Sequence, residues 1–487
     1  MWIASTFRNL SEARRPNTSF VFLRRSECSE SRCRCLTAVV LMNESLEVWL
    51  YGTRLAEIEK GSKQRLSLRF TDDARRRFGP NSSILSTSLQ VRREPYPNAL
   101  TRNFLDGLLP EEDTRERIAR ELDLHKEDTF GLVRELGRDC AGALVVQPSG
   151  RPPPYSLPRQ QAQAIDNDEV ARRIAALPAS PLGVDRYVRL SLAGVQRKLL
   201  LVRRDDGGWA LPSHGIPSTH ILKPQLQNSE WSHTVENEAY AMRLAKTIGL
   251  NVASVDVENI GGQSVLVVER FDRTVENGAI GRVHQEDFCQ VFGLRPQDKY
   301  QSSGGPSLRT VADALSRNTS SRDVTELLRI ATFNVTVGNA DAHAKNFALL
   351  HRPDDSLELA PAYDVMSTTF YPGLDQTLGM YVDEVRNIDK VTPNRLVNEA
   401  AQWGMDREEA ASIVNETLTK LAEASRDTSL SPASKLLGES IGRRTEQMLE
   451  ATPIAGLDRL EFVAEPGRLR GGPGTNQYEI KPRRPRR

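Results

Sequence analysis

The chain of 487 residues and 54.4 kDa has room for two or three domains of about 150 residues each. Its 65 basic and 64 acidic residues leave a formal charge of +1, which argues against a chain built mainly to wrap nucleic acid. No window approaches the ~20 continuous apolar residues of a membrane helix and five cysteines give no disulfide framework, so we expect a globular, cytoplasmic protein that does not enter a membrane.

The two ends of the chain differ in composition from its body. Residues 1–41 carry seven Arg against three Glu, and residues 466–487 carry seven Lys or Arg against one Glu. We predict that the terminal segment 451–487 holds a disordered basic tail, either a solvated terminus or an arm that binds nucleic acid. Strand-like alternation begins only after Met42. Residues 1–41 are therefore interpreted as a disordered leader or as sequence upstream of the natural start, with a transit peptide as the alternative.

Residues 42–150 are predicted to form an N-terminal α+β domain. The alternation over 46–60 around a glycine turn predicts a β-hairpin, and further short strands are expected over 64–94. Apolar residues near a period of 3.6 predict helix over 101–136. The segment 151–184, which begins rich in proline, is predicted to be a linker and connecting segment.

The second half of the chain divides into a strand-rich and a helix-rich part. Residues 185–272 hold several short apolar strands and one helix, which predicts a strand-rich lobe. Residues 273–450 become mostly helical, which predicts a helix-rich lobe. We therefore predict an α+β protein with two lobes and a cleft between them, preceded by the N-terminal domain.

The densest polar cluster, residues 338–346, directly follows a predicted apolar helix over 324–337. Asp341 and Asn346 have the D-x-x-x-x-N spacing of phosphoryl-transfer loops, and Asp364 comes later at the end of a predicted strand. A carboxylate can orient an attacking hydroxyl, and Asn and Asp oxygens are ligands that Mg²⁺ prefers. The cluster therefore predicts a catalytic Asp341 with a metal site at Asn346 and Asp364. The alternative is a capped helix end whose polar groups are satisfied internally.

Three upstream features supply other parts that such an enzyme needs. Lys223, at the end of a predicted strand, could contact phosphates, and Glu238 on the next helix could position that lysine. The strand–turn–strand 191–198 could cover phosphates with its backbone, and the strand end 269–271 could bind adenine. Taken alone, these features are equally compatible with an ordinary hairpin, a surface lysine and an exposed helical glutamate.

Six motifs occur in order and carry a family resemblance. They are SLAGVQRK at 191–198, THILK at 219–223, ERFD at 269–272, HQEDFCQVFG at 284–293, DAHAKNF at 341–347 and PAYD at 361–364. Together with LEVWLYG at 46–52, LDGLLP at 105–110 and GRDCAG at 137–142, they closely resemble the HipA family of serine/threonine kinases, the toxins of bacterial HipBA toxin–antitoxin modules. The resemblance runs from about Met42 to about residue 450.

The resemblance implies a bilobed fold similar to protein kinases and lipid kinases, with an extra N-terminal α+β domain. It implies that Asp341 is the catalytic aspartate, that Asn346 and Asp364 bind Mg²⁺, and that Ser191 is autophosphorylated, which would switch the enzyme off by repulsion between phosphates. The residues that it assigns to ATP are Ala193, Gly194, Val195, Gln196, Arg197, Lys198, Lys223, Glu269, Arg270, Phe271, His343, Ala344, Lys345, Asn346, Tyr363 and Asp364.

The resemblance also implies partners. Members of the family phosphorylate an aminoacyl-tRNA synthetase, of which glutamyl-tRNA synthetase is the best known. They also pair with a small helix-turn-helix antitoxin of the HipB type. Contact with operator DNA is then expected mainly through the antitoxin. Two alternatives remain at this point: a kinase-fold corepressor that acts by binding antitoxin and operator, and a small-molecule phosphotransferase that shares the Asp-x-x-x-x-Asn loop.

Overall fold

The computed structural model describes residues 44–177, 182, 197–213, 215–226, 231–276, 278–427 and 435–450. The predictions about the leader 1–41, the start at Met42 and the tail 451–487 lie outside these residues. Within them, no helix is both long and apolar enough to cross a membrane.

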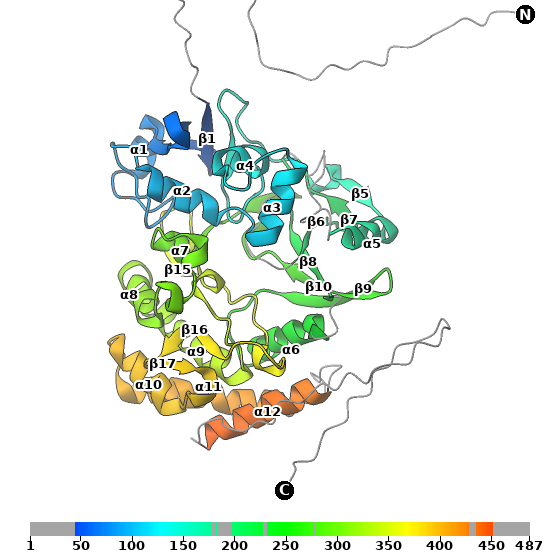
Figure 1. The fold of residues 1–487 in the computed structure, drawn as a ribbon, viewed down its shortest axis with the longest axis vertical. Coiled ribbons are helices and arrows are strands. Elements are labelled where there is room, and N and C mark those ends of the chain that lie inside the picture. The colour runs from blue at the N-terminus through cyan, green and yellow to red at the C-terminus, as the bar shows by residue number, and fades with distance from the viewer. Residues whose placement is uncertain are drawn as a thin grey trace, which may run out of the picture. The chain divides into compact units, whose positions relative to one another are not determined.

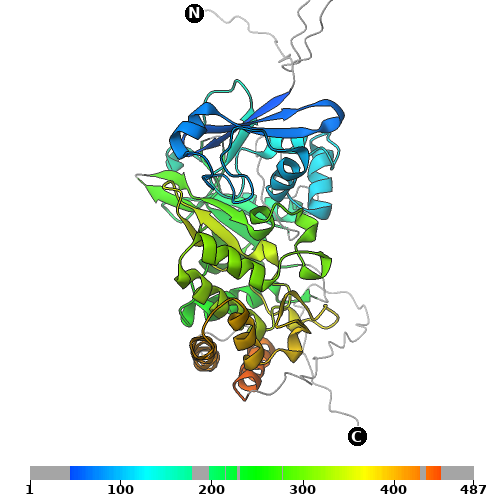
Figure 2. The same ribbon diagram turned by 90° about the vertical axis from the view of Figure 1, so that its left-hand side faces the viewer.

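The N-terminal domain, which contains β1 at the top of Figure 1, is built on a four-stranded antiparallel sheet in the order β3-β2-β1-β4. Its strands are β1 (Ser45–Leu50), β2 (Thr53–Lys60), β3 (Leu66–Phe70) and β4 (Val145–Pro148). The predicted hairpin is confirmed, since β1 and β2 pair across a turn at Tyr51 and Gly52. Helices α1 (Asp72–Phe78), α2 (Asn98–Gly107) and α4 (Thr129–Leu136) pack against the sheet (Figure 2).

Two predictions for this domain are wrong in detail. Only β3 forms within 64–94, because Thr71 caps the amide of Ala74 and opens helix α1 (Asp72–Phe78). The helical stretch 101–136 is three helices, namely α2 (Asn98–Gly107), α3 (Glu112–Glu121) and α4 (Thr129–Leu136). Pro110 separates α2 from α3, since a proline disfavours the helical conformation of the residue before it. Asp128 caps the third helix.

A six-stranded sheet in the order β5-β7-β6-β8-β10-β9 forms the strand-rich lobe. Its strands are β5 (Gln163–Ile165), β6 (Leu199–Arg203), β7 (Trp209–Leu211), β8 (His220–Pro224), β9 (Val255–Ile260) and β10 (Gln263–Glu269). Helix α6 (Thr234–Thr247) packs on β9 and β10. The structure differs from the prediction of a linker over 151–184, because β5 extends the sheet and helix α5 (Asn167–Ala176) packs against β9.

The helix-rich lobe is centred on the largely buried helix α9 (Ser321–Val337), which α8 (Leu308–Asn318), α10 (Pro393–Gln402), α11 (Arg407–Ser425) and α12 (Lys435–Leu449) contact. Its small sheets are β11 (Arg273–Glu276) with β12 (Ala279–Arg282), β13 (His284–Asp287) with β14 (Ala348–His351) and β15 (Leu357–Leu359), and β16 (Thr377–Val382) with β17 (Val385–Asn387). The short helix α7 (Phe288–Val291) follows β13.

Buried charges join the N-terminal domain to the end of the strand-rich lobe. Arg273 Nη2 lies 2.9 Å from Asp139 Oδ1, and Arg270 Nη2 lies 2.8 Å from Asp272 Oδ2. The amide of Gly142 donates to Asp272 at 2.7 Å, and this glycine has φ +76°, a backbone conformation that favours glycine. Removing one partner of such a buried pair leaves an uncompensated charge, at a cost of about 3–5 kcal/mol.

A second junction attaches the same domain to the helix-rich lobe. Glu286 in β13 accepts hydrogen bonds from Ser86 Oγ at 2.5 Å, from the Thr87 amide at 2.8 Å and from His351 Nε2 at 2.9 Å. The Thr87 hydroxyl donates a fourth hydrogen bond at 2.8 Å, and Glu286 and His351 are both fully buried. The N-terminal domain is therefore an integral part of the packed structure.

His284 makes the stability of this junction depend on pH. Burial lowers its pKa from the ordinary 6.5 to about 3, with His351 acting in the same direction, while its Nε2 bonds the Leu85 carbonyl oxygen. Below pH ~6.5 the unfolded chain takes up a proton on this histidine that the folded protein excludes. The free energy of unfolding therefore decreases by about 1 kcal/mol for each unit by which the pH is lowered. In His284→Gln we expect a shallower fall between pH 6.5 and 4.5, measured by thermal unfolding.

The control is His125→Gln, at an exposed position of the N-terminal domain, which should keep the wild-type slope. An unchanged slope in His284→Gln contradicts the assignment.

Candidate active site

A buried lysine joins two acidic side chains from different parts of the chain. Lys223 lies in β8, Glu238 in α6, and Asp364 after β15. The Lys223 Nζ is 2.7 Å from Glu238 Oε1 and 2.5 Å from Asp364 Oδ1. The side chains of Lys223 and Glu238 are 9% and 4% exposed, whereas that of Asp364 is 48% exposed. The lysine is thus enclosed, and one of its two carboxylates faces solvent.

The charges of this group support one another. Burial lowers the pKa of Lys223, but Asp364 and Glu238 outweigh this and hold the pKa above its ordinary value. The Lys223 ammonium in turn lowers the pKa of Asp364 to about 2, whereas burial raises the pKa of Glu238. At neutral pH the site therefore presents an ionised, partly open carboxylate beside a permanently charged lysine.

The polar cluster 338–346 is held at the end of α9 by a tight turn. Gly338 ends the helix with φ +80°, and a Cβ at this position would collide with Thr369 Oγ1. The hydroxyl of Thr368 donates to the Gly338 carbonyl at 3.1 Å and accepts from the Ala340 amide at 2.9 Å. The segment that follows Asp364 thereby fixes the start of the loop that carries Asp341.

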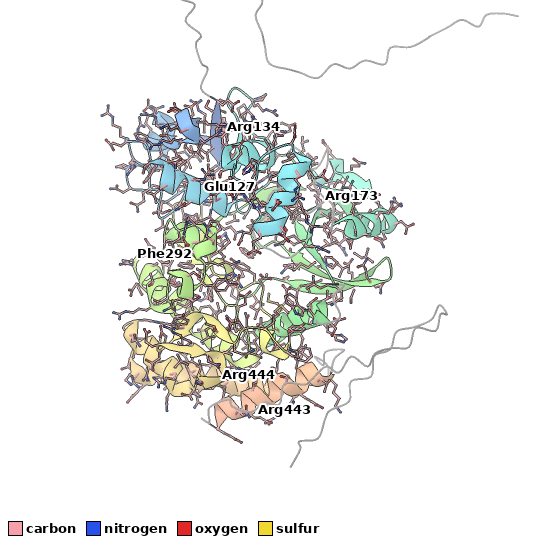
Figure 3. The ribbon with its side chains drawn as sticks, viewed as in Figure 1. Glu127, Arg134, Arg173, Phe292, Arg443 and Arg444 are labelled. Atoms are coloured by element: carbon pink, nitrogen blue, oxygen red, sulfur yellow. The ribbon has the colours of Figure 1, made fainter. Side chains whose placement is uncertain are left out.

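Arg444 supports this helix end from a distant part of the sequence. It lies on α12 (Figure 3), where its side chain is almost fully buried. One guanidinium nitrogen donates to the Val335 carbonyl at 3.3 Å, and another lies 2.8 Å from Asp389 Oδ1. A cation at the C-terminus of a helix also stabilises the helix dipole, so Arg444 steadies the end of α9 from which the loop begins.

Asp341 is open to solvent, and its surroundings fix its carboxylate and its backbone. Tyr300 Oη donates to Asp341 Oδ1 at 2.8 Å. The Asp341 carbonyl accepts from the His343 amide at 2.8 Å and from Asn346 Nδ2 at 3.2 Å. Desolvation by the surrounding protein raises the pKa of Asp341, the Tyr300 hydrogen bond acts against this, and the Asp364 carboxylate adds to it. Asp341 and Asp364 are therefore near enough to repel each other.

Two other polar side chains of the loop are buried. His343 is buried with its ring 5.0 Å from that of Tyr300, and burial lowers its pKa to about 4, so it is neutral at pH 7. Lys345 is also buried, with its Nζ 2.6 Å from Asp287 Oδ2. Tyr363 Oη donates to the Lys345 carbonyl at 2.6 Å. The charge of Lys345 is thus compensated inside the protein.

The structure brings most, but not all, of the predicted site residues together. One group is Lys223, Glu238 and Asp364, and a second is Asp341, His343, Ala344, Lys345 and Asn346. Lys198 is buried, and its pKa falls to about 8 through burial and the nearby Lys223. The Phe271 ring lies 5.5 Å from that of Tyr363.

Other predicted residues lie elsewhere or cannot be placed. The Arg270 side chain is buried in the junction with the N-terminal domain, and Glu269 is exposed at the end of β10. The Arg270 side chain is therefore committed to that junction. Arg197 is exposed just before β6. Ser191, Ala193, Gly194, Val195 and Gln196 lie outside the described residues.

The donor set suits a magnesium ion that is shared with phosphates. No group of three or more His, Cys, Asp or Glu side chains in the described part of the chain forms a metal site by itself. Mg²⁺ commonly needs only one or two protein oxygens, the rest coming from water and phosphate. Asp364 offers a partly open carboxylate, and Asn346 uses its amide nitrogen toward Asp341, which leaves its oxygen as the metal-binding end. The residues present therefore fit the predicted ion.

Sequence reasoning missed the residues that support the loop from outside. They are Glu111, Asp287, Lys299, Tyr300 and Arg444. Glu111 directly follows the motif at 105–110, which was a usable signal. Asp287 lies inside the motif at 284–293, which was a signal of the same kind. Nothing in the spacing of Lys299, Tyr300 and Arg444 relates them to Asp341, because each acts through a contact made only in the folded chain.

Comparisons with known proteins show which family the chain resembles. Residues 190–425 match the family model described as the HipA-like C-terminal domain, and residues 46–147 match that of the HipA N-terminal domain. A protein of Sinorhizobium fredii named as the putative kinase Y4mE is 40% identical over 72% of this chain and 84% of its own length. The serine/threonine-protein kinase toxin HipA of Shewanella oneidensis is 35% identical over 60% of this chain and 68% of its own length.

A solved structure extends the likeness to the fold. It is the Shewanella oneidensis HipA in complex with HipB and its operator DNA, and it superposes with a TM-score of 0.70 at 28% identity, covering 83% of this chain and 96% of that chain. The α+β fold class predicted from the sequence is thereby confirmed, as is the resemblance that the motifs carry. This chain therefore belongs to the HipA family of kinase toxins.

Proposed function

We propose that the chain is an ATP- and Mg²⁺-dependent serine/threonine protein kinase that acts as the toxin of a toxin–antitoxin module. The observation that carries the proposal is the Lys223 ammonium between Glu238 and Asp364, within the same site as Asp341. An enclosed cation and an open carboxylate are the groups needed to hold nucleotide phosphates with a metal ion.

Each residue then has a defined part in the reaction. The Asp341 carboxylate accepts a hydrogen bond from the substrate hydroxyl, orients the hydroxyl oxygen toward the γ-phosphate and acts as the base that takes up the proton. Asn346 and Asp364 would hold Mg²⁺, which supplies neutralisation of phosphate charge when it is bound. Glu238 keeps Lys223 in place, and Lys223 donates to phosphate oxygens. His343, neutral and buried, stays a hydrogen-bonding group without adding charge.

The partners follow from the relatives. The solved relative is a complex with HipB and operator DNA, which supports a HipB-type antitoxin as the partner here, with operator DNA bound mainly through it. We propose an aminoacyl-tRNA synthetase as the protein substrate, and glutamyl-tRNA synthetase is the first candidate to test. Phosphorylation of Ser191 would end activity, because a phosphate adds about −1.5 to −2 charge next to the loop that covers ATP.

Asp341→Asn tests the chemistry. The variant keeps the shape of the side chain but cannot act as the base, so we expect phosphoryl transfer to fall at least ~100-fold, about 3 kcal/mol of transition-state stabilisation. Growth inhibition should disappear while antitoxin binding remains. Asp313→Asn, an exposed position on α8, is the matched control. Growth arrest that survives in Asp341→Asn would indicate a corepressor that acts by binding alone.

Lys223→Met tests the nucleotide site. Loss of the ammonium removes its phosphate contact, and we expect a non-hydrolysable ATP analogue to bind at least ~10-fold more weakly, about 1.4 kcal/mol. Glu238→Gln, which keeps the side-chain volume, should weaken binding less. Lys246→Met, exposed in the last turn of α6, should bind like the wild type. Calorimetric titration measures all three, and equal affinity in Lys223→Met contradicts the proposed nucleotide site.

Phosphosite mapping tests substrate and regulation together. The protein is incubated with Mg²⁺ and γ-labelled ATP, alone and with a cell lysate, and labelled peptides are identified by mass spectrometry. We expect label on Ser191 and on a tRNA synthetase. Label confined to small molecules supports the phosphotransferase alternative, and label on other proteins refutes the synthetase assignment.

A further inference from the structure

One carboxylate of the N-terminal domain lies against the catalytic region. Glu111 is the N-cap residue of α3, and its side chain is 8% exposed. Its Oε2 accepts a hydrogen bond from Lys299 Nζ at 3.1 Å, and its Oε1 lies 3.8 Å from Lys345 Nζ. Glu111 is therefore a counter-ion shared by two buried lysines of the helix-rich lobe.

Both lysines belong to the structure that holds Asp341. Lys345 lies within the loop 338–346 itself. The Lys299 carbonyl accepts a hydrogen bond from the Ala344 amide at 3.1 Å, so Lys299 is tied to the same loop. Its neighbour Tyr300 donates to the Asp341 carboxylate at 2.8 Å. Glu111 is thus connected to Asp341 along two short paths, one through each lysine.

The charges of this group balance only when Glu111 is ionised. Lys345 also has Asp287 as a counter-ion, whereas Glu111 is the one carboxylate recorded within 4 Å of the Lys299 ammonium among the described residues. A buried ammonium without a counter-ion is costly, so loss of the Glu111 charge would drive Lys299 toward water. Because Tyr300 is the next residue, its bond to Asp341 would be disturbed as well.

We propose that Glu111 is a positioning residue for Asp341, through which the N-terminal domain sets the geometry of phosphoryl transfer. This inference rests on the proposed kinase function. It assigns the N-terminal domain a part in the reaction itself, since the ion pair crosses from one domain to the other. It also predicts which kinetic constant changes, because the nucleotide-holding residues Lys223 and Glu238 lie outside the Glu111 group.

The test compares Glu111→Gln with the wild type in the full-length protein. We expect kcat for phosphoryl transfer to fall about 10- to 100-fold, while the KM for ATP and the affinity for a non-hydrolysable ATP analogue stay within about twofold. Glu111→Asp, which keeps the charge on a shorter side chain, should recover part of kcat. A merely structural role would lower the melting temperature without this split between kcat and KM.

Two further variants make the result decisive. Tyr51→Phe removes the hydroxyl that joins the N-terminal domain to His351 and His284, a contact between the same domains that involves neither lysine, and should keep the wild-type kcat. Lys299→Gln with Glu111→Gln forms a double-mutant cycle, in which the double variant should be little worse than Lys299→Gln alone. Additive losses, an unchanged kcat in Glu111→Gln, or an equal loss of ATP affinity would each overturn the proposal.

The same measurements separate this proposal from the proposed function. A wild-type protein that neither binds the ATP analogue nor transfers phosphate refutes the kinase assignment. A wild-type protein that is active together with an equally active Glu111→Gln variant refutes only the positioning role.

Discussion

The ammonium group of Lys223 joins the two lobes of the protein through ion pairs with two carboxylates. The lysine comes from a strand of the six-stranded sheet, Glu238 from the helix packed on that sheet, and Asp364 from the helix-rich lobe. A buried lysine is tolerated only where carboxylates compensate its charge, so this contact constrains how the sheet, α6 and the segment around Asp364 pack. The same requirement leaves one carboxylate open to solvent, where a metal ion and phosphates can reach it.

Compensated charge recurs wherever the N-terminal domain touches the rest of the chain. The Asp139–Arg273 pair, the hydrogen-bonded Glu286 and the Glu111–Lys299 pair are three separate junctions, and all are buried. Such pairs contribute little net stability compared with apolar packing, but each strongly disfavours an arrangement that separates its partners. They therefore specify one docking geometry of the domain, and the Glu111 pair lies next to the loop that carries Asp341.

The sequence predicts local structure and linear motifs well, and long-range contacts poorly. The hairpin at 46–60, the apolar helix α9 and the loop after it follow from periodicity and from glycine, which act over a few residues. The pairing of Lys223 with Glu238 could be anticipated from a strand end followed by a helix, and the place of Asp364 from a strand end and from the family resemblance. The roles of Tyr300 and Arg444 could not, since the first lies 41 residues from its partner Asp341 and the second 109 residues from Val335. The edge strand β5 escaped prediction because three residues carry no recognisable pattern.

Arg444 has a practical consequence for how the protein can be shortened. It is the group on α12 that reaches the carbonyl end of α9, immediately before the turn at Gly338. A chain that ends before Arg444 loses this guanidinium, and one that ends anywhere before Met448 removes part of the apolar face that Leu437, Ile441 and Met448 bury. Truncations intended to remove the basic tail while keeping a working enzyme should therefore end after Leu449, and a fusion partner at the C-terminus needs a spacer beyond that residue.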